Sequence, residues 1–296
     1  MTRKAGGTFG KAVRGVLFAL RSWMRRIFEP CMTFLTWAAG VLTIGILAFL
    51  VGFILFKGVP YIKPSLFALQ YNSENVSLMP ALISTVLMTL LSLFIAVPLG
   101  VFAAIYLTEY AKRGNKAVTA VRVTTETLSG IPSIVYGLFG MLFFVTFLKW
   151  GYSLLAGAFT LSIMILPLIM RSSEEALRSV PDTYREGSFG LGAGKLRTVF
   201  KIVLPSAMPG ILAGIILSIG RIVGETAALI YTAGTVAQIP QNPMMSARTL
   251  SVHMYALSSE GLHTNEGYAT AVMLLVVVVL INTLSVKIAK KIGANL

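Results

Sequence analysis

"YREGSFGLGAGKLRTVFKIVLP", residues 184–205, is a charged, glycine-rich stretch between two apolar parts of the chain. Its letters GLGAGK resemble a phosphate-binding loop, which requires G-x-x-x-x-G-K-[ST] after a strand. The first glycine of that pattern would fall on Phe189, and Leu196 stands where Ser or Thr is needed. No strand is predicted before the stretch. A nucleotide-binding loop is therefore excluded, and the stretch needs another explanation.

Helix signals fill this region, residues 171–205. Ser172 and Glu175 have the spacing of a capping box, and Pro181 suits the first turn of a second short helix. A run of glycines allows a sharp turn or close approach by another backbone: Gly187, Gly190, Gly192 and Gly194. After the turn, one face of a predicted helix is apolar: Leu196, Val199, Phe200, Val203 and Leu204. Pro205 is expected to stop this helix or bend it.

The rest of the chain has the composition of a membrane protein. Of its 296 residues, 56% are hydrophobic and 12% are charged, about half the charged share of soluble domains. About 20 apolar residues cross a bilayer. Six stretches meet that length and predict an all-α protein with six transmembrane helices: 31–56, 75–108, 127–148, 150–170, 206–234 and 267–286.

Basic residues predict the orientation. Twenty of the 25 Lys and Arg residues lie in the N-terminal tail, the 109–122 loop, the 171–205 loop and the C-terminal tail. The positive-inside rule places these segments, and both termini, in the cytoplasm. The same rule accounts for the net charge of +14, so nucleic acid is not an expected partner.

The predicted organisation has three parts. Residues 1–30 are expected to form a basic amphipathic helix on the cytoplasmic membrane face, with apolar positions such as Val13 opposite arginines such as Arg14. Residues 31–286 form the six-helix domain, and residues 287–296 form a cytoplasmic tail.

The 171–205 loop resembles a sequence pattern of the permease subunits of ABC importers, E-A-A-x3-G-x9-I-x-L-P. The matching positions are Glu186, Gly187, Ser188, Gly192, Ile202, Leu204 and Pro205. Gly187 and Ser188 replace the two alanines but keep the side chains small. The resemblance implies the type I importer fold and a cytoplasmic coupling helix that sits in a cleft of a separate ATPase subunit. ATP and Mg²⁺ are then expected on that partner, and no cofactor is expected in this chain.

Two further segments, SGIPSIVYGLFG (129–140) and GRIVGETAAL (220–229), resemble the PstA family of phosphate-importer permeases, and the resemblance extends over most of the chain. It implies import of inorganic phosphate across the bacterial inner membrane. It also implies four kinds of partner: a second permease (PstC-like), two ATPase subunits (PstB-like), a periplasmic phosphate-binding protein (PstS-like) and the lipid bilayer. Two alternatives stay open, an importer of another oxyanion and a stand-alone secondary anion transporter.

Arg221 and Glu225 are the only charged residues inside a predicted crossing. A central arginine is costly in a bilayer and needs a function or a partner. At helical spacing Arg221 lies on a stripe of glycines, Gly210, Gly214, Gly220 and Gly224, and Glu225 lies one turn beyond it. The two residues are predicted either to line the translocation path for an oxyanion or to pin helix packing as a neutralised pair.

Other chemistry is not indicated by the sequence. His253 and His263 stand in an outer loop without a nearby cysteine or carboxylate cluster, so no metal site is predicted. The sequence contains no G-x-S-x-G or H-E-x-x-H pattern, and no catalytic residue is assigned. The chain is therefore expected to be a permease and not an enzyme.

Overall fold

The computed structural model describes the backbone of residues 5–112 and 114–294, and side chains of residues 28–112 and 114–287. Throughout these described residues the regular structure is helical, as the apolar stretches predict. The chain divides into two compact units, residues 1–56 and residues 57–296. They are taken one at a time below.

The first unit consists of helix α1, which as a whole runs Ala5–Gly58. Apolar residues without a charge fill positions 31–56, and the segment Phe28–Tyr61 is long and apolar enough to cross a membrane. Its side chains are exposed, for example Phe34 and Phe56. Residues 1–30 were expected to form an amphipathic surface helix. Its predicted faces, with Val13 and Arg14, lie outside the residues whose side chains are described.

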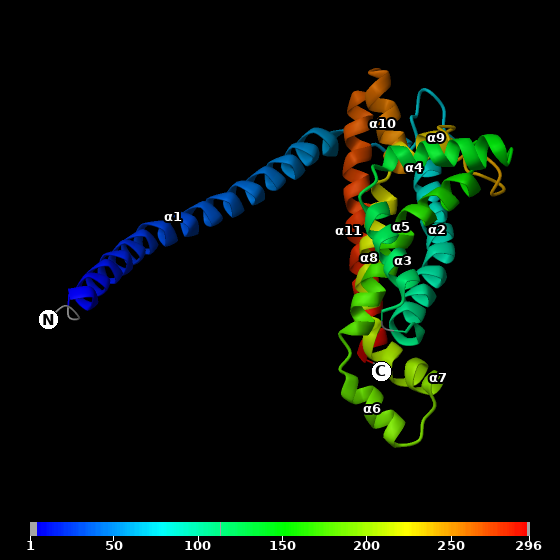
Figure 1. The fold of residues 1–296 in the computed structure, drawn as a ribbon. Coiled ribbons are helices and arrows are strands. Elements are labelled where there is room, and N and C mark those ends of the chain that lie inside the picture. The colour runs from blue at the N-terminus through cyan, green and yellow to red at the C-terminus, as the bar shows by residue number, and fades with distance from the viewer. Residues whose placement is uncertain (1–4, 113, 295–296) are drawn as a thin grey trace. The chain divides into compact units, whose positions relative to one another are not determined.

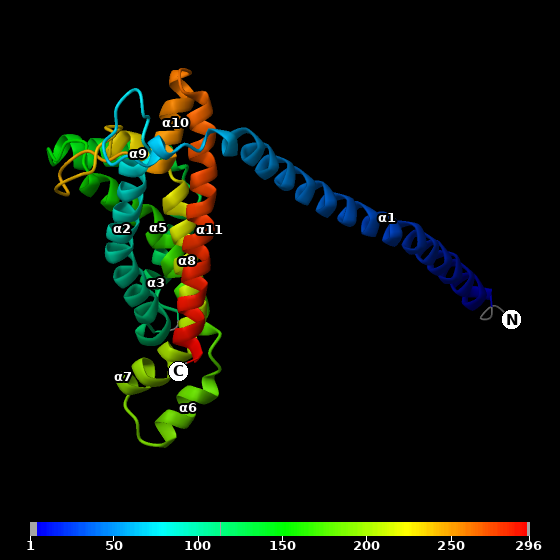
Figure 2. The ribbon, with the colours of Figure 1, turned by 180° about the vertical axis from the view of Figure 1, so that it is seen from behind.

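The second unit is a bundle of long helices: α2 (Met79–Ile105), α5 (Leu154–Arg178), α8 (Leu204–Gly224) and α11 (Thr264–Ala294). Figures 1 and 2 show them side by side, with α5 in contact with α2 and α8, and α8 with α11. Small residues let α5 and α8 approach closely: a Cβ built on Gly214 would lie 2.4 Å from the Ser172 Cβ. Leu161 and Ile165 of α5 are fully buried in the core.

Shorter elements close the two ends of the bundle. They are η1 (Val59–Tyr61), η2 (Pro64–Phe67), η3 (Tyr106–Tyr110), α3 (Lys116–Ser129), α4 (Ser133–Gly140), η4 (Met141–Phe147), α6 (Asp182–Gly190), α7 (Lys195–Thr198), η5 (Val199–Val203), α9 (Ala227–Thr232) and α10 (Leu250–Glu260). In both views α6 and α7 lie at one end, where α11 also ends, and α4, α9 and α10 lie at the other (Figures 1 and 2). Residues 287–294 of the predicted C-terminal tail belong to α11, which ends at Ala294.

The third expected crossing, 127–148, differs from the prediction. Among the described residues five helices are long and apolar enough to span a membrane, and the remaining candidate is a pair of helices, Lys116–Ser129 with Ser133–Phe147, bent by 102°. Pro132 lies at the break, with ψ 142°. It restrains Ile131 away from the helical region and cannot donate a backbone hydrogen bond. In place of one straight helix over 127–148, the chain therefore forms a bent pair that starts at Lys116 and is either a broken crossing or a re-entrant loop.

Candidate functional site

The predicted 171–205 loop is more helical than expected at its start. α5 continues to Arg178, so Ser172 and Glu175 lie inside it and do not cap a new helix. The Glu175 carboxylate instead pairs with Arg171 one turn earlier, with 3.2 Å between Nε and Oε1. The second predicted helix exists: α6 begins at Asp182, directly after Pro181.

The glycine turn is confirmed, whereas the helix after it differs from the prediction in two ways. Gly192 has φ +79°, which favours glycine, and makes the turn after α6. Pro205 does not end the helix, because the chain stays helical from Lys195 to Gly224. The proline lacks the amide hydrogen for the usual bond four residues back, and the wider π-helical turn η5 directly precedes it. Val199 and Val203 are buried as predicted, but Leu196 is 67% exposed.

A buried hydrogen bond fixes α6 against the helix that follows the turn. The Ser188 and Thr198 hydroxyls are 2.8 Å apart, and both residues are almost fully buried. The Thr198 hydroxyl also lies 3.2 Å from the Gly194 carbonyl oxygen, to which it can donate. Ser188, which stands in place of an alanine, therefore holds the shape of the loop from inside and does not face a partner.

The outer surface of α6 and α7, here named the coupling surface, is open. A Cβ added to Gly187 or Gly192 would meet nothing within 4 Å, and Glu186 is exposed. Large apolar side chains are exposed around these positions: Tyr184 (53%), Phe189 (47%), Leu191 (91%) and Leu196 (67%). Ile202, Leu204 and Pro205 follow on η5 and α8 and are partly buried. Apolar side chains gathered on a charged segment are typical of a protein interaction site.

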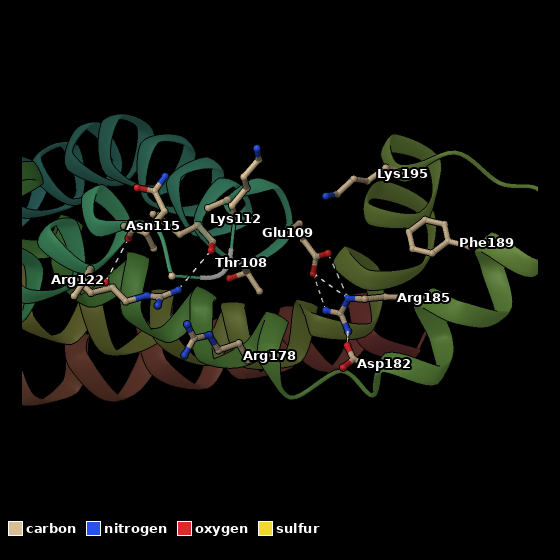
Figure 3. Close-up of a pocket in the computed structure, with 15 residues that line it drawn as sticks. Thr108, Glu109, Lys112, Asn115, Arg122, Arg178, Asp182, Arg185, Phe189 and Lys195 are labelled. Atoms are coloured by element: carbon tan, nitrogen blue, oxygen red, sulfur yellow. Dashed lines mark hydrogen bonds and ion pairs between the residues drawn. The ribbon is translucent and has the colours of Figure 1, made fainter.

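Arg185 anchors this loop to the end of α2, a link that no sequence pattern predicted. Its guanidinium donates to the Glu109 carboxylate of η3, with Nη2 2.6 Å from Oε1, and to Asp182 at 3.2 Å (Figure 3). It also donates to the Val180 and Leu177 carbonyls, at 2.8 and 3.0 Å. Only 15% of the Arg185 side chain and 7% of the Glu109 side chain are exposed. The hydrogen bond to Glu109 raises the pKa of Arg185, so the guanidinium stays protonated.

Glu225 was predicted to lie one helical turn beyond Arg221, but the structure places it outside the helix. α8 ends at Gly224, and Glu225 is extended, with ψ 128°. Its carboxylate accepts the Ala228 amide hydrogen at 3.0 Å at the start of α9, and its carbonyl accepts from the Ser251 hydroxyl at 2.6 Å. The expected one-turn spacing fails because the helix stops before Glu225. Within the part of the chain that the structure describes, no carboxylate lies within ion-pair distance of Arg221.

The structure brings together the two segments that resemble phosphate-importer permeases. A Cβ on Gly137 would lie 2.8 Å from the Ala228 Cα, so α4 and α9 pack backbone to backbone. Tyr136, near the start of α4, is buried, and its hydroxyl donates to the Leu128 carbonyl of α3 at 2.8 Å, so this hydrogen bond links the two helices across the break.

The glycine stripe around Arg221 has two parts. Built Cβ atoms on Gly210 and Gly214 would clash with α5, at Ala176 and Ser172, whereas those on Gly220 and Gly224 would meet nothing within 4 Å. The first two glycines therefore serve helix packing. The half that flanks Arg221 is free of packing within this chain.

His253 is fully buried in α10, outside the candidate spans. Its Nδ1 lies 3.3 Å from an Arg248 nitrogen, and its ring meets the Tyr71 ring edge-on. Burial first, and the Arg248 charge second, lower the pKa of His253 to about 4. Among the described residues no group of three potential metal ligands occurs.

Comparison with known proteins identifies the family. Residues 96–293 match the family model described as binding-protein-dependent transport system inner membrane component. A probable ABC transporter permease protein, YqgI of Bacillus subtilis, is 39% identical over 185 residues, which cover 58% of this chain and 63% of YqgI. The phosphate transport system permease protein PstA 1 of Mycobacterium tuberculosis is 43% identical over 154 residues, 52% of this chain and 50% of that protein. Each match spans less than two thirds of the relative.

A solved structure shares the fold. A chain of the bacterial alginate ABC transporter, crystallised in complex with an alginate pentasaccharide-bound periplasmic protein, superposes with a TM-score of 0.62 at 16% identity. The match covers 92% of this chain and 96% of that one. At this identity the likeness concerns the fold alone, and it is the all-helical permease fold expected from the sequence. With the family model matching well over half of its residues, the chain belongs to the family of binding-protein-dependent transport system inner membrane components.

Proposed function

We propose that this chain is a permease subunit of an ATP-driven, binding-protein-dependent importer of inorganic phosphate. The observation that carries the proposal is the coupling surface. Exposed Phe189, Leu191 and Leu196 stand on a segment that projects from one end of the bundle (Figures 1 and 2). Burying such side chains against a partner is favourable by about 25 cal/mol per Å² of apolar area. The partner is a separate ATPase subunit, and this chain itself is not an enzyme and holds no cofactor.

The complex has the composition usual for such importers. This chain pairs with a second permease, and each permease contacts one of two ATPase subunits through its coupling surface. A periplasmic binding protein delivers the substrate on the other side. The basic loops and both termini face the cytoplasm of a bacterial cell, since 20 of 25 Lys and Arg residues lie on that side. The α6–α7 end of the bundle is then cytoplasmic.

Coupling depends on how firmly the loop is held. The Arg185–Glu109 pair ties α6 to η3, and the Ser188–Thr198 hydrogen bond ties α6 to α7. A force applied by the ATPase to Glu186, Gly187 or Gly192 is therefore transmitted to α2 and α8, not absorbed by a flexible loop. Because the Arg185 guanidinium is hydrogen-bonded on several sides, rotation of α6 independently of its neighbours would break several charge-assisted hydrogen bonds.

Similarity to a protein named as a phosphate transport system permease supports phosphate as the substrate. Arg221 supports an anionic substrate: it lies on α8 without a carboxylate partner among the described residues, beside the open positions Gly220 and Gly224. Its guanidinium offers a transient cation to an oxyanion in the path. Glu225 acts differently from the expectation, since it holds the start of α9 near that path.

Reconstitution tests the proposal and its alternatives together. The chain, the second permease and the ATPase are reconstituted in liposomes that enclose ATP. The binding protein and labelled phosphate are added outside, and uptake of the label into the liposomes is measured. We expect uptake that needs ATP and binding protein and resists competition by sulfate. Sulfate competition at equal concentration would assign another oxyanion. Gradient-driven uptake by this chain alone would assign a secondary transporter.

A further inference from the structure

A cavity of about 810 Å³ lies between the end of α2, the start of α3 and the 171–205 loop, which is called the coupling loop below (Figure 3). Its lining is rich in charged side chains. The cations are Lys112, Arg122, Arg178, Arg185 and Lys195, and the carboxylates are Glu109 and Asp182. Positive charge therefore exceeds negative charge in its walls.

Both carboxylates in the lining of this cavity already form ion pairs within the chain. Glu109 and Asp182 both pair with Arg185. Behind the wall, one Glu174 carboxylate oxygen lies 2.7 Å from both Arg122 and Arg178. One negative charge thus serves two guanidiniums, which keep unused donors.

Two lysines complete the excess. Lys112 follows η3, and Lys195 opens α7. Neither has a carboxylate within ion-pair distance among the residues that the structure describes. The Lys195 Nζ is held 5.0 Å from the centre of the Tyr110 ring, and Figure 3 shows this side chain extending toward the segment that carries Glu109 and Lys112. The two lysines line the cavity from different elements, Lys112 from the segment after η3 and Lys195 from the start of α7.

We propose that this cavity binds a phosphate-bearing group between Lys112 and Lys195, with Arg122 and Arg178 behind it. The volume lies in the range of about 300–1,000 Å³ typical of small-ligand sites and exceeds the needs of a single inorganic ion. Basic pockets at the cytoplasmic ends of transmembrane helices accept anionic lipid headgroups. The group comes either from an anionic phospholipid or from a soluble phosphorylated compound. Once bound, it bridges α7 to the segment before α3 and restrains the coupling loop.

The lipid source is tested on the detergent-purified complex that contains the full chain. Native mass spectrometry measures retention of cardiolipin against phosphatidylcholine. The test variant is Lys112→Gln with Lys195→Gln. The matched control is Arg197→Gln with Lys201→Gln, two exposed cations of the same region that do not line the cavity. Each lysine near a surface contributes about fivefold in affinity for an anionic headgroup, so we expect the test variant to bind cardiolipin about thirtyfold more weakly and the control to bind it as the wild type does.

The soluble source is tested with pyrophosphate and no ATP, as a rise in the thermal unfolding temperature of the same complex. A rise that is lost in the test variant and kept in the control assigns a soluble phosphate compound, whereas loss of cardiolipin alone assigns the lipid. Equal binding of both probes by the test and control variants, or no binding by the wild type, overturns the proposal. Because binding is the readout, the result is independent of whether the chain imports phosphate.

Discussion

Arg185 and Glu109, 76 residues apart in the chain, form a hydrogen-bonded ion pair that joins α6 to η3 at the end of α2. Nη2 lies 2.6 Å from Oε1, and Nε lies 3.2 and 3.3 Å from the two carboxylate oxygens. The remaining donors go to Asp182 and to two backbone carbonyls at the end of α5. One side chain thus sets the position of the coupling surface relative to two transmembrane helices.

Removing Arg185 alone should be strongly destabilising. Arg185→Met leaves the Glu109 carboxylate buried without its partner, and we expect a loss of about 3–5 kcal/mol in the free energy of unfolding. The double variant Arg185→Met with Glu109→Gln should lose less, because no charge is stranded. Arg178→Ala is the control: its side chain is 52% exposed, and Glu174 keeps Arg122, so we expect less than about 1 kcal/mol. Thermal unfolding of the purified complex checks all three, and equal losses for the single and double variants would contradict the role of the pair.

Gly187→Glu should separate the ATPase from the permease. Gly187 has ordinary helical geometry and open space around it, so the substitution does not strain this chain. A carboxylate forced into a closing interface lacks a partner, and we expect ATPase retention in a pull-down to fall at least about tenfold. Gly187→Ala is the control and should retain the ATPase. Gly192 is a poorer test site, since its φ of +79° makes any side chain strained. Wild-type retention in the Glu variant would refute the docking assignment.

Arg221→Gln should abolish uptake while the complex still assembles. The change removes the charge but keeps hydrogen-bond donors, and we expect a loss of at least about tenfold in labelled phosphate uptake. Arg221→Lys should retain part of the activity. Glu225→Gln is the informative comparison: its amide oxygen still accepts from Ala228, so transport should persist. If Glu225→Gln abolished uptake and Arg221→Gln did not, the assignment of the path would be wrong.

Acid should destabilise the α10 region through His253. Its pKa falls from 6.5 in the unfolded chain to about 4 in the folded one. As pH drops from about 6.5 to about 4, the unfolded state binds a proton that the folded state does not, and up to about 3 kcal/mol of stability is lost. His253→Asn, which keeps an acceptor for Arg248, should flatten this part of the pH profile. Thermal unfolding between pH 7.5 and 4 provides the test, and identical slopes for both proteins would count against it.

Topology can be mapped with fusion reporters. A reporter placed after Lys195 should behave as cytoplasmic and one after Asn242 as periplasmic, because the basic loops stay inside. The bent pair adds a specific test: a reporter after Asn115, before α3, and one after Lys149 should lie on opposite sides if α3, α4 and η4 together make one crossing. The same compartment for both would make this pair a re-entrant loop.

The features that depend on local composition were predictable from the amino-acid sequence. Apolar stretches such as 31–56 and 267–286 predict crossings because about 20 apolar residues suffice to span a bilayer. The short helix after Pro181 and the turn at Gly192 follow from local backbone preferences of proline and glycine. The break before α4 was not predicted, although Pro132 is a local signal for it because a proline restricts the residue before it.

The contacts between segments far apart in the chain were not predictable from the sequence. The Arg185–Glu109 pair joins residues far apart in the chain, and no local pattern selects one carboxylate among several. Glu225 left the helical register of Arg221 because its carboxylate and carbonyl both find partners, at Ala228 and on α10. The two segments that resemble phosphate-importer permeases meet because α4 and α9 pack backbone to backbone at Gly137. Helix propensity and hydropathy act over a few turns, whereas these contacts are set by how the whole bundle packs.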